Sequence, residues 1–354
     1  MVAALVTGAA AGAGIGYVLQ RGQLCFLSMF ASTLARRTLL LHGWLLGVAV
    51  ASVGLSLLYL TAWSHGLNTG LPFTPVSDIA GGLLIGTGMA VASSCTSGLF
   101  TKLGSGMFGA LAGLAGWVAG ELAARPVHLP GPRVLAGGPA ATLAGVTGVP
   151  RLALSVLFLA LVAGTLWRWP TAERPAEPWQ WTAPRLGVAL GLVTIAGWVL
   201  AKAGGSRFGP STVGASASVA SGSPNWWLIA FLLAIVAGAA IAARTAGGWQ
   251  LRAETPVRYA RLAAGGFLLG AGGWIAGGCN LGHGLSGVAQ LNVSSWVVVA
   301  SMAAGVGLSA AAARGHLTVR APSGSVLLCR TGRGTCVGPG RTMRECVPFP
   351  PGAA

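Results

Sequence analysis

Two stretches of the chain repeat one motif: AGGLLIGTGMAVASSCTSG at residues 80–98 and AGGFLLGAGGWIAGGCNLG at residues 264–282. They align without a gap, nine of nineteen positions are identical, and Cys95 falls on Cys279. Each stretch is predicted to be an apolar helix that runs into a break rich in glycine or serine, with a cysteine at its tip. A duplicated broken helix in a hydrophobic chain is typical of a membrane transporter whose pathway lies at the repeat interface.

The composition places the chain in a lipid bilayer. Of its 354 residues, 54% are hydrophobic and 8% are charged, whereas soluble domains carry about 25% charged residues. The formal net charge of +16 lies mostly in loops and in the tail, which is typical of topology control and does not indicate nucleic-acid binding. A field that favours an anionic solute is the functional alternative. We therefore predict an all-α integral membrane protein.

Nine membrane spans are predicted, at about residues 2–20, 41–62, 79–93, 107–124, 151–167, 186–202, 226–243, 262–276 and 294–313. The third and the eighth are short for a full crossing, so each is expected to be a half-helix that meets a re-entrant piece. Shorter helices are expected after the breaks, near residues 24–36, 97–104, 211–221 and 281–292. Glycines four residues apart are predicted to let helix backbones pack closely: Gly8, Gly12 and Gly16, Gly82 and Gly86, Gly266 and Gly270.

The basic residues of the loops predict an N-terminus outside and a C-terminus in the cytoplasm. A first repeat, residues 1–124, then begins outside, and a second, residues 186–314, begins inside, because the connector 125–185 contains one extra span. The two repeats are therefore expected to be inverted in the membrane. The Arg-rich tail, residues 315–354, is predicted to be disordered, and its cysteines match no zinc module.

Three cysteines at the breaks are the candidate functional residues: Cys25, Cys95 and Cys279. Cys25 lies 70 residues before Cys95, and the equivalent position before Cys279 is Gly209. Inverted repeats would bring Cys95 and Cys279 together near mid-membrane and place Cys25 toward the cytoplasmic mouth. A single free cysteine is often a small buried hydrophobe, but three at matched breaks favour a function.

A line of thiols suits a soft, sulfur-rich solute, because the S–H group is a weak donor and sulfur is soft. Helix N-termini after the breaks favour an anion, and neutral donors lie beside the cysteines: Thr96, Ser97, Asn280 and Ser286. Several weak contacts let a solute enter and leave, which indicates permeation of a small sulfur oxyanion. His283 could donate to this anion or pack between helices. Lys102 could attract anions at the mouth of the pathway, but we favour its extension to the membrane interface, where Arg21 is also expected.

The acidic residues do not suggest coupled pumping. Asp78 is predicted to be a helix N-cap, and no chain of buried carboxylates indicates a proton relay. No catalytic triad, cofactor motif or metal motif is found, so we expect no catalytic residue, cofactor or metal. Two alternatives stay open: a membrane sulfurtransferase that forms a persulfide on Cys95 or Cys279, and a transporter of soft metal ions such as Cu(I).

The motifs RGQLCF, SSCTSG and GGCNLGHGLSG together resemble those of the YeeE/YedE family of inner-membrane sulfur-transport proteins, over residues 1–314. The resemblance implies an hourglass-shaped helical protein of two pseudo-symmetric halves that imports thiosulfate. It also implies that Cys25, Cys95 and Cys279 pass the ion by S–H···S hydrogen bonds, and that a small cytoplasmic sulfur carrier of the TusA type is a partner. Ser93 and Ser94 depart from the expected Gly or Ala, and the tail does not resemble the family.

Overall fold

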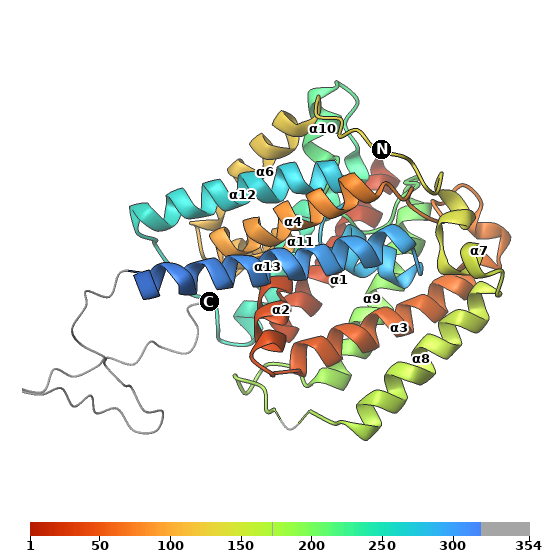
Figure 1. Ribbon diagram of the computed structural model, residues 1–354, viewed down its shortest axis with the longest axis horizontal. Coiled ribbons are helices and arrows are strands. Elements are labelled where there is room, and N and C mark those ends of the chain that lie inside the picture. Colours follow the sequence, from red (N-terminus) through yellow and green to blue (C-terminus); the bar gives the residue numbers. More distant parts are fainter. Residues whose placement is uncertain (172, 320–354) are drawn as a thin grey trace, which may run out of the picture.

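The computed structural model describes residues 1–171 and 173–319, with side chains up to residue 313. Helices joined by loops make up this part of the chain (Figure 1). The long helices are α1 (Val2–Gly22), α3 (Leu39–Tyr59), α4 (Pro75–Ala92), α6 (Ala110–Ala124), α8 (Arg151–Arg168), α9 (Ala183–Ala203), α11 (Trp226–Thr245), α12 (Pro256–Ala276) and α13 (Val293–Val319). Short helices lie between them: α2 (Phe26–Leu34), η1 (Ala62–Ser64), α5 (Thr96–Gly104), η2 (Gly138–Ala141), α7 (Leu143–Thr147), α10 (Ala215–Ala220) and the π-helix η3 (Gly282–Gly287).

Each predicted span corresponds to one long helix. Among the described residues, seven segments are long and apolar enough to cross a membrane, two of which join a long helix to the short one after its break (Val2–Leu34 and Pro75–Gly104). Helix α6 is a shorter apolar helix, and α12 has 21 residues but carries Arg258 and Arg261 in its first turns. The count of nine spans therefore stays a prediction with which these helices are compatible.

Predicted and observed boundaries differ by up to six residues, and the eighth span and the tail differ most. The eighth span was expected to be short, yet α12 begins at Pro256, because Thr255 caps it and Pro256 occupies its first turn. At 1.5 Å per residue, its 21 residues reach about 31 Å. The tail was expected to begin at residue 315, but α13 continues to Val319. The remainder of the predicted tail lies outside the described residues.

Asp78 is not the N-cap of α4. The N-cap is Thr74, and Asp78 lies in the first turn, where its Oδ2 atom accepts a hydrogen bond from the Thr74 amide at 3.2 Å. The carboxylate thus satisfies one of the free N–H groups at the helix start. Its side chain is 1% exposed, because α4 packs against both α12 and α13.

Helices at equivalent positions of the two predicted repeats make equivalent contacts. Helix α1 packs along α11 and α9 packs along α3, while α12 packs along α6 and α4 along α13. Helices α4 and α12 also pack against each other, as do α1 and α9. Helix α8 lies at the edge, against α3 and α7 (Figure 1). This arrangement is compatible with the predicted repeats and leaves α8 as the element outside them.

The spaced glycines lie where helices approach most closely, as predicted. A Cβ atom added at Gly12 or Gly16 would overlap the α11 backbone, at the carbonyls of Phe231 and Ile235. The same holds for Gly266 and Gly270 against α6. Small residues therefore set the spacing of these helix pairs.

Candidate solute pathway

All three candidate cysteines follow a helix that ends in the left-handed conformation. The C-cap residues are Gln23 for α1 (φ 51°), Ser93 for α4 (φ 49°) and Gly277 for α12 (φ 72°). A left-handed C-cap stops a helix and turns the chain, and each cysteine comes two residues later. The turn costs a residue with a Cβ atom about 1–2 kcal/mol, a penalty that glycine avoids. These caps direct the three thiols into the interior.

Cys25 and Cys95 form a direct contact. They are the N-caps of α2 and α5, and their Sγ atoms lie 3.3 Å apart. The Cys95 amide donates to the Cys25 Sγ atom at 3.4 Å, and the Gly98 amide donates to the Cys95 Sγ atom at 3.3 Å. Cys95 is fully buried and Cys25 is half-buried. We call these two residues the thiol pair; Cys25 is its accessible member.

Cys279 is surrounded by backbone donors. Its Sγ atom accepts hydrogen bonds from the amides of Thr212 and Leu281, both at 3.3 Å, and of Gly282 at 3.5 Å. The residue is 1% exposed. Successive backbone N–H groups that converge on one point form a concavity that favours anions. The break after α12 therefore offers a small electropositive site around this sulfur.

The expected meeting of Cys95 and Cys279 is indirect. The Asn280 Nδ2 atom donates to the Ser97 Oγ atom at 2.7 Å, and this hydroxyl lies 3.4 Å from the Cys95 Sγ atom. We call Ser97 and Asn280 the polar bridge; both are fully buried. It links the break after α4 with the break after α12, so polar contacts run from Cys25 through Cys95 and the bridge to the residue beside Cys279.

Two polar atoms next to the bridge have no hydrogen-bond partner among the described residues. They are the Thr96 hydroxyl and the Asn280 Oδ1 atom, both fully buried. An unpaired buried polar group costs about 1–3 kcal/mol, and such groups deserve a functional explanation. Thr96, Ser97 and Asn280 were all predicted site residues, and the structure brings them together with the thiol pair.

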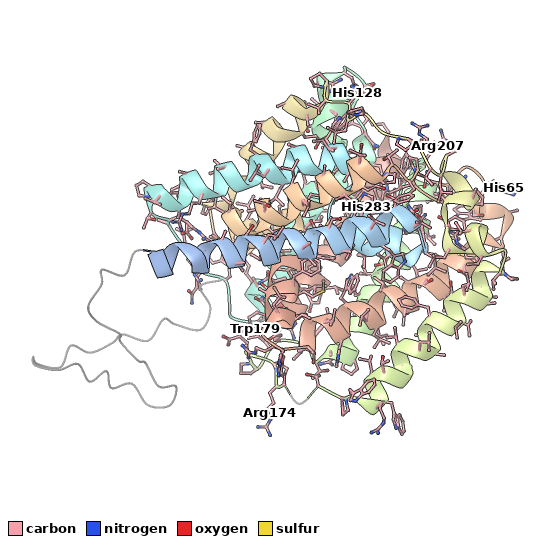
Figure 2. The ribbon with its side chains drawn as sticks, in the orientation of Figure 1. His65, His128, Arg174, Trp179, Arg207 and His283 are labelled. Carbon is pink, nitrogen blue, oxygen red and sulfur yellow. The ribbon has the colours of Figure 1, made fainter. Side chains whose placement is uncertain are left out.

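His283 is occupied by helix packing. Its Nδ1 atom lies 2.9 Å from the Ser295 hydroxyl and its Nε2 atom 2.8 Å from the Ala276 carbonyl. Because a carbonyl only accepts, Nε2 carries the proton, and Nδ1 accepts from the serine. Figure 2 shows His283 inside the bundle, unlike His65 and His128. This geometry favours the packing interpretation over contact with an anion.

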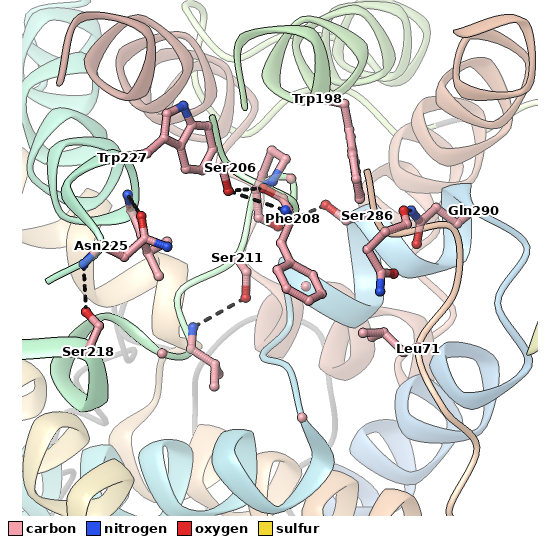
Figure 3. A pocket seen from close by; sticks show the side chains of 18 of the residues that line it. Leu71, Trp198, Ser206, Phe208, Ser211, Ser218, Asn225, Trp227, Ser286 and Gln290 are labelled. Atoms are coloured by element: carbon pink, nitrogen blue, oxygen red, sulfur yellow. Dashed lines mark hydrogen bonds between the residues drawn. The ribbon is translucent and has the colours of Figure 1, made fainter. Parts of the chain in front are cut away.

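A cavity of about 510 Å³ lies next to the break that carries Cys279. Gly277 and Gly282, which flank this cysteine, and Ser286 form part of its wall. Figure 3 shows the side chains of Trp198, Phe208 and Trp227 around the space. Uncharged side chains line it throughout; those not yet named include Trp274, Asn68, Ser211 and Asn225. We call it the aromatic cavity.

Specific contacts hold the cavity wall in place. The segment between α9 and α11 forms much of that wall, and the Ser286 hydroxyl donates to its Pro210 carbonyl at 2.9 Å. The Gly214 amide donates to the Glu121 Oε1 atom at 2.8 Å, and this carboxylate is fully buried. The motif alignment identified Gly209 in this segment as a fourth tip. It gave no signal for the tryptophans, which come from three separate helices or loops.

A half-buried arginine, Arg151, contacts the backbone of Gln290, one of the residues that line the aromatic cavity. Arg151 donates from Nη2 to the carbonyls of Thr69 at 2.7 Å and Gln290 at 2.8 Å, and its guanidinium lies 4.6 Å from the Tyr59 ring centroid. Gln290 in turn donates to the Tyr59 hydroxyl at 2.7 Å. Arg151 is the first residue of α8 and ties this helix to the cavity wall.

The two interfacial predictions have different outcomes. The Lys102 Nζ atom donates to the Ser93 carbonyl at 2.7 Å, so the side chain folds back onto the end of α4 and does not extend to the interface. Arg21 lies with its guanidinium 5.9 Å from the centroid of Trp181, and its place at the membrane interface stays a prediction.

These features define a class of protein: a helical membrane protein with broken helices, whose buried thiols and amides lie beyond a polar and aromatic cavity, as in membrane transporters. Residues 21–308 match the sequence profile of the family described as sulphur transport, and the chain belongs to this family. It is 32% identical over 324 residues to the thiosulfate transporter TsuA of Spirochaeta thermophila, covering 82% of this chain and 93% of the relative. It is 25% identical over 334 residues to the thiosulfate transporter TsuA of Escherichia coli, covering 86% of this chain and 94% of the relative.

Proposed function

We propose that this protein imports thiosulfate, or a closely related small sulfur anion, through a pathway on which Cys25, Cys95 and Cys279 lie. The family membership and the names of the two relatives support sulfur transport and favour a transporter over an enzyme. The observation that carries the proposal is the contact of the thiol pair at 3.3 Å, joined through the polar bridge to the break at Cys279.

The chemistry of the contacts fits a soft anion. Thiosulfate has a terminal sulfur that accepts weak S–H hydrogen bonds, and oxygens that accept from N–H and O–H groups. The Cys279 Sγ atom accepts hydrogen bonds from three backbone amides. An anion that binds at this break therefore meets the same donors. Weak donors at successive sites allow the ion to move on, because tight binding at one site would stop passage.

The direction of transport follows from the proposed topology. With the N-terminus outside, the start of α1 faces outward, and Gly8 in this part of α1 lies against Trp227 of the aromatic cavity. The anion then enters from outside, passes Cys279 and the polar bridge, and reaches the thiol pair on the cytoplasmic side. The matching packing of α1 on α11 and α9 on α3 supports the inverted repeats 1–124 and 186–314 that this pathway requires.

The resemblance also supports a bacterial inner-membrane location and a TusA-type sulfur carrier as a cytoplasmic partner. Such a carrier would take the anion where Cys25 is half-buried. This part of the proposal rests on the family alone.

The experiment is uptake of labelled thiosulfate into proteoliposomes that hold the full chain. Because each thiol is one step of a single path, Cys95→Ala and Cys279→Ala should abolish uptake, and Cys25→Ala should reduce it strongly. Replacement of Cys329, Cys336 and Cys346 by Ala is the matched control and should leave uptake unchanged. Wild-type uptake by folded Cys95→Ala protein would refute the relay.

The same preparation separates the alternatives. A persulfide found by mass spectrometry on Cys95 or Cys279, together with sulfur transfer to an added thiol, would identify a sulfurtransferase. Uptake of Cu(I) in place of thiosulfate would identify a soft-metal transporter.

A further inference from the structure

We propose that Lys102 and Arg258, which converge on Ser93, form a binding site for a small oxyanion beside the thiol pair. This inference rests on the proposed function, because it assigns the anion a resting place where it leaves the thiols. We call the three residues the basic site.

The basic site is built from three elements. Lys102 belongs to α5, Arg258 to α12, and Ser93 is the left-handed C-cap of α4. The Lys102 Nζ atom donates to the Ser93 carbonyl at 2.7 Å, and the Arg258 Nη1 atom donates to the Ser93 hydroxyl at 3.0 Å. All three residues are half-buried, so the site is reachable from one end of the bundle.

Helix capping explains only part of this arrangement. A lysine on the last carbonyls of a helix is an ordinary capping contact, and this accounts for Lys102. It does not account for Arg258, whose bond to the Ser93 hydroxyl satisfies no carbonyl of α4. Two cations that share one serine repel each other, and an anion between them would reverse this cost.

The charges of the basic site are not balanced. One carboxylate, Glu254, lies 4.0 Å from the Arg258 Nε atom, at the limit of an ion pair between two partly exposed side chains. Among the described residues the Lys102 ammonium has one hydrogen-bond acceptor, and this acceptor is a neutral carbonyl. Lys102 keeps donors to spare, and arginine presents a fork that matches oxyanion geometry.

The position of the basic site relates it to the thiols. Ser93 is two residues before Cys95, whose sulfur contacts the half-buried Cys25. The motif alignment places Gly277 and Ser286 at the positions of Ser93 and Lys102, and both line the uncharged aromatic cavity. Cations therefore lie next to the thiol pair, whereas the residues that line the cavity beside Cys279 are uncharged.

The test measures how fast charged reagents reach Cys25. The thiolate of a cysteine attacks the RS sulfur of a methanethiosulfonate reagent, which forms a mixed disulfide as the bond to the sulfonyl group breaks and methanesulfinate leaves; the thiol proton goes to solvent. The full chain, with its three tail cysteines replaced by Ala, is treated with a sulfonate-bearing and an ammonium-bearing reagent, and labelling of Cys25 is followed by mass spectrometry. The sulfonate reagent should react faster, since two cations attract it and repel its counterpart.

The variants Lys102→Gln and Arg258→Gln should each lower the ratio of the two rates by about tenfold, and added thiosulfate should protect Cys25 less well. Arg261→Gln is the matched control. The substitution removes the same charge, and Arg261 is an exposed residue of the same helix. Lys102→Arg keeps the charge and should keep the ratio. A variant that does not fold is replaced by the other one of the pair.

A ratio that stays at the wild-type value in Lys102→Gln and Arg258→Gln, or that falls equally in Arg261→Gln, would overturn the site. This outcome differs from failure of the proposed function. If the ratio responds as expected while proteoliposomes take up no thiosulfate, the basic site stands and thiosulfate import fails. If uptake depends on the cysteines but the ratio does not respond, import stands and the basic site fails.

Discussion

The polar bridge makes the most specific prediction for transport. Asn280→Ala removes the 2.7 Å hydrogen bond to Ser97 and with it the polar link between the two breaks. A hydrogen bond of this kind contributes about 0.5–1.5 kcal/mol. If the passing anion uses these groups at its highest barrier, uptake should fall about two- to tenfold.

The free energy of unfolding should change little in the Asn280→Ala variant. The substitution loses one hydrogen bond, but it also removes the buried Asn280 Oδ1 atom, which has no partner among the described residues. Leaving such an atom unpaired costs about 1–3 kcal/mol, so the two effects offset each other. We expect the free energy of unfolding in detergent to change by less than about 2 kcal/mol.

Asn292→Ala is the matched control. Asn292 is also fully buried, and neither polar atom of its amide has a partner in the described part of the chain. It precedes α13 and is not part of the polar bridge, so its replacement should leave uptake near the wild-type rate. Thiosulfate uptake by both variants is measured in proteoliposomes, after their folding is checked by size exclusion and thermal unfolding.

A double-mutant cycle with Ser97→Ala completes the test. Because Ser97 and Asn280 are in contact, their effects on uptake should not add, and the coupling energy should be about 0.5–1.5 kcal/mol. The reasoning is refuted if folded Asn280→Ala protein transports like the wild type. It is equally refuted if Asn292→Ala loses as much uptake as Asn280→Ala.

Two further predictions concern the wall of the aromatic cavity and the packing of α1 on α11. Glu121→Ala removes the acceptor for the Gly214 amide and should raise the KM for thiosulfate. Glu121→Gln keeps an acceptor oxygen, so its KM should stay close to the wild-type value. Equal KM values for the two variants would contradict this role. Gly16→Val places a side chain against the Ile235 carbonyl and should lower thermal stability and folded yield. Gly164→Ala should be tolerated, because a Cβ atom at that position meets no neighbour. Equal melting temperatures for the two variants would contradict this reasoning.

Much of the helical architecture follows from the sequence, because membrane spans are long and apolar. The pattern located every long helix but misplaced the start of α12, since Arg258 and Arg261 lower the hydropathy of a segment that is helical from Pro256. A hydropathy window reports where lipid is tolerated, whereas helix starts depend on capping residues such as Thr255.

The candidate site was predictable where the chain repeats itself. The matched breaks identified Cys25, Cys95 and Cys279, and the polar residues beside them proved to be the polar bridge. The contact between Ser97 and Asn280 was not predictable, because it forms only through the packing of α4 on α12. The fold of Lys102 onto Ser93 was missed for a similar reason, since its hydrogen bond reaches back to the preceding helix.

The proposed pathway follows the duplicated motif, and the departures from the duplication would give that pathway a direction. Equivalent breaks place sulfur atoms at the starts of α5 and of the segment that leads into η3. At one end, glycines and Ser286 leave room for an uncharged cavity. At the other end, serine and lysine occupy the equivalent positions, and both Lys102 and Arg258 donate hydrogen bonds to Ser93. A symmetric path would bind an anion equally from both sides. If the basic site binds an anion as proposed, its cations lower the free energy of the anion there, and the two ends of the path then differ in affinity although the scaffold repeats.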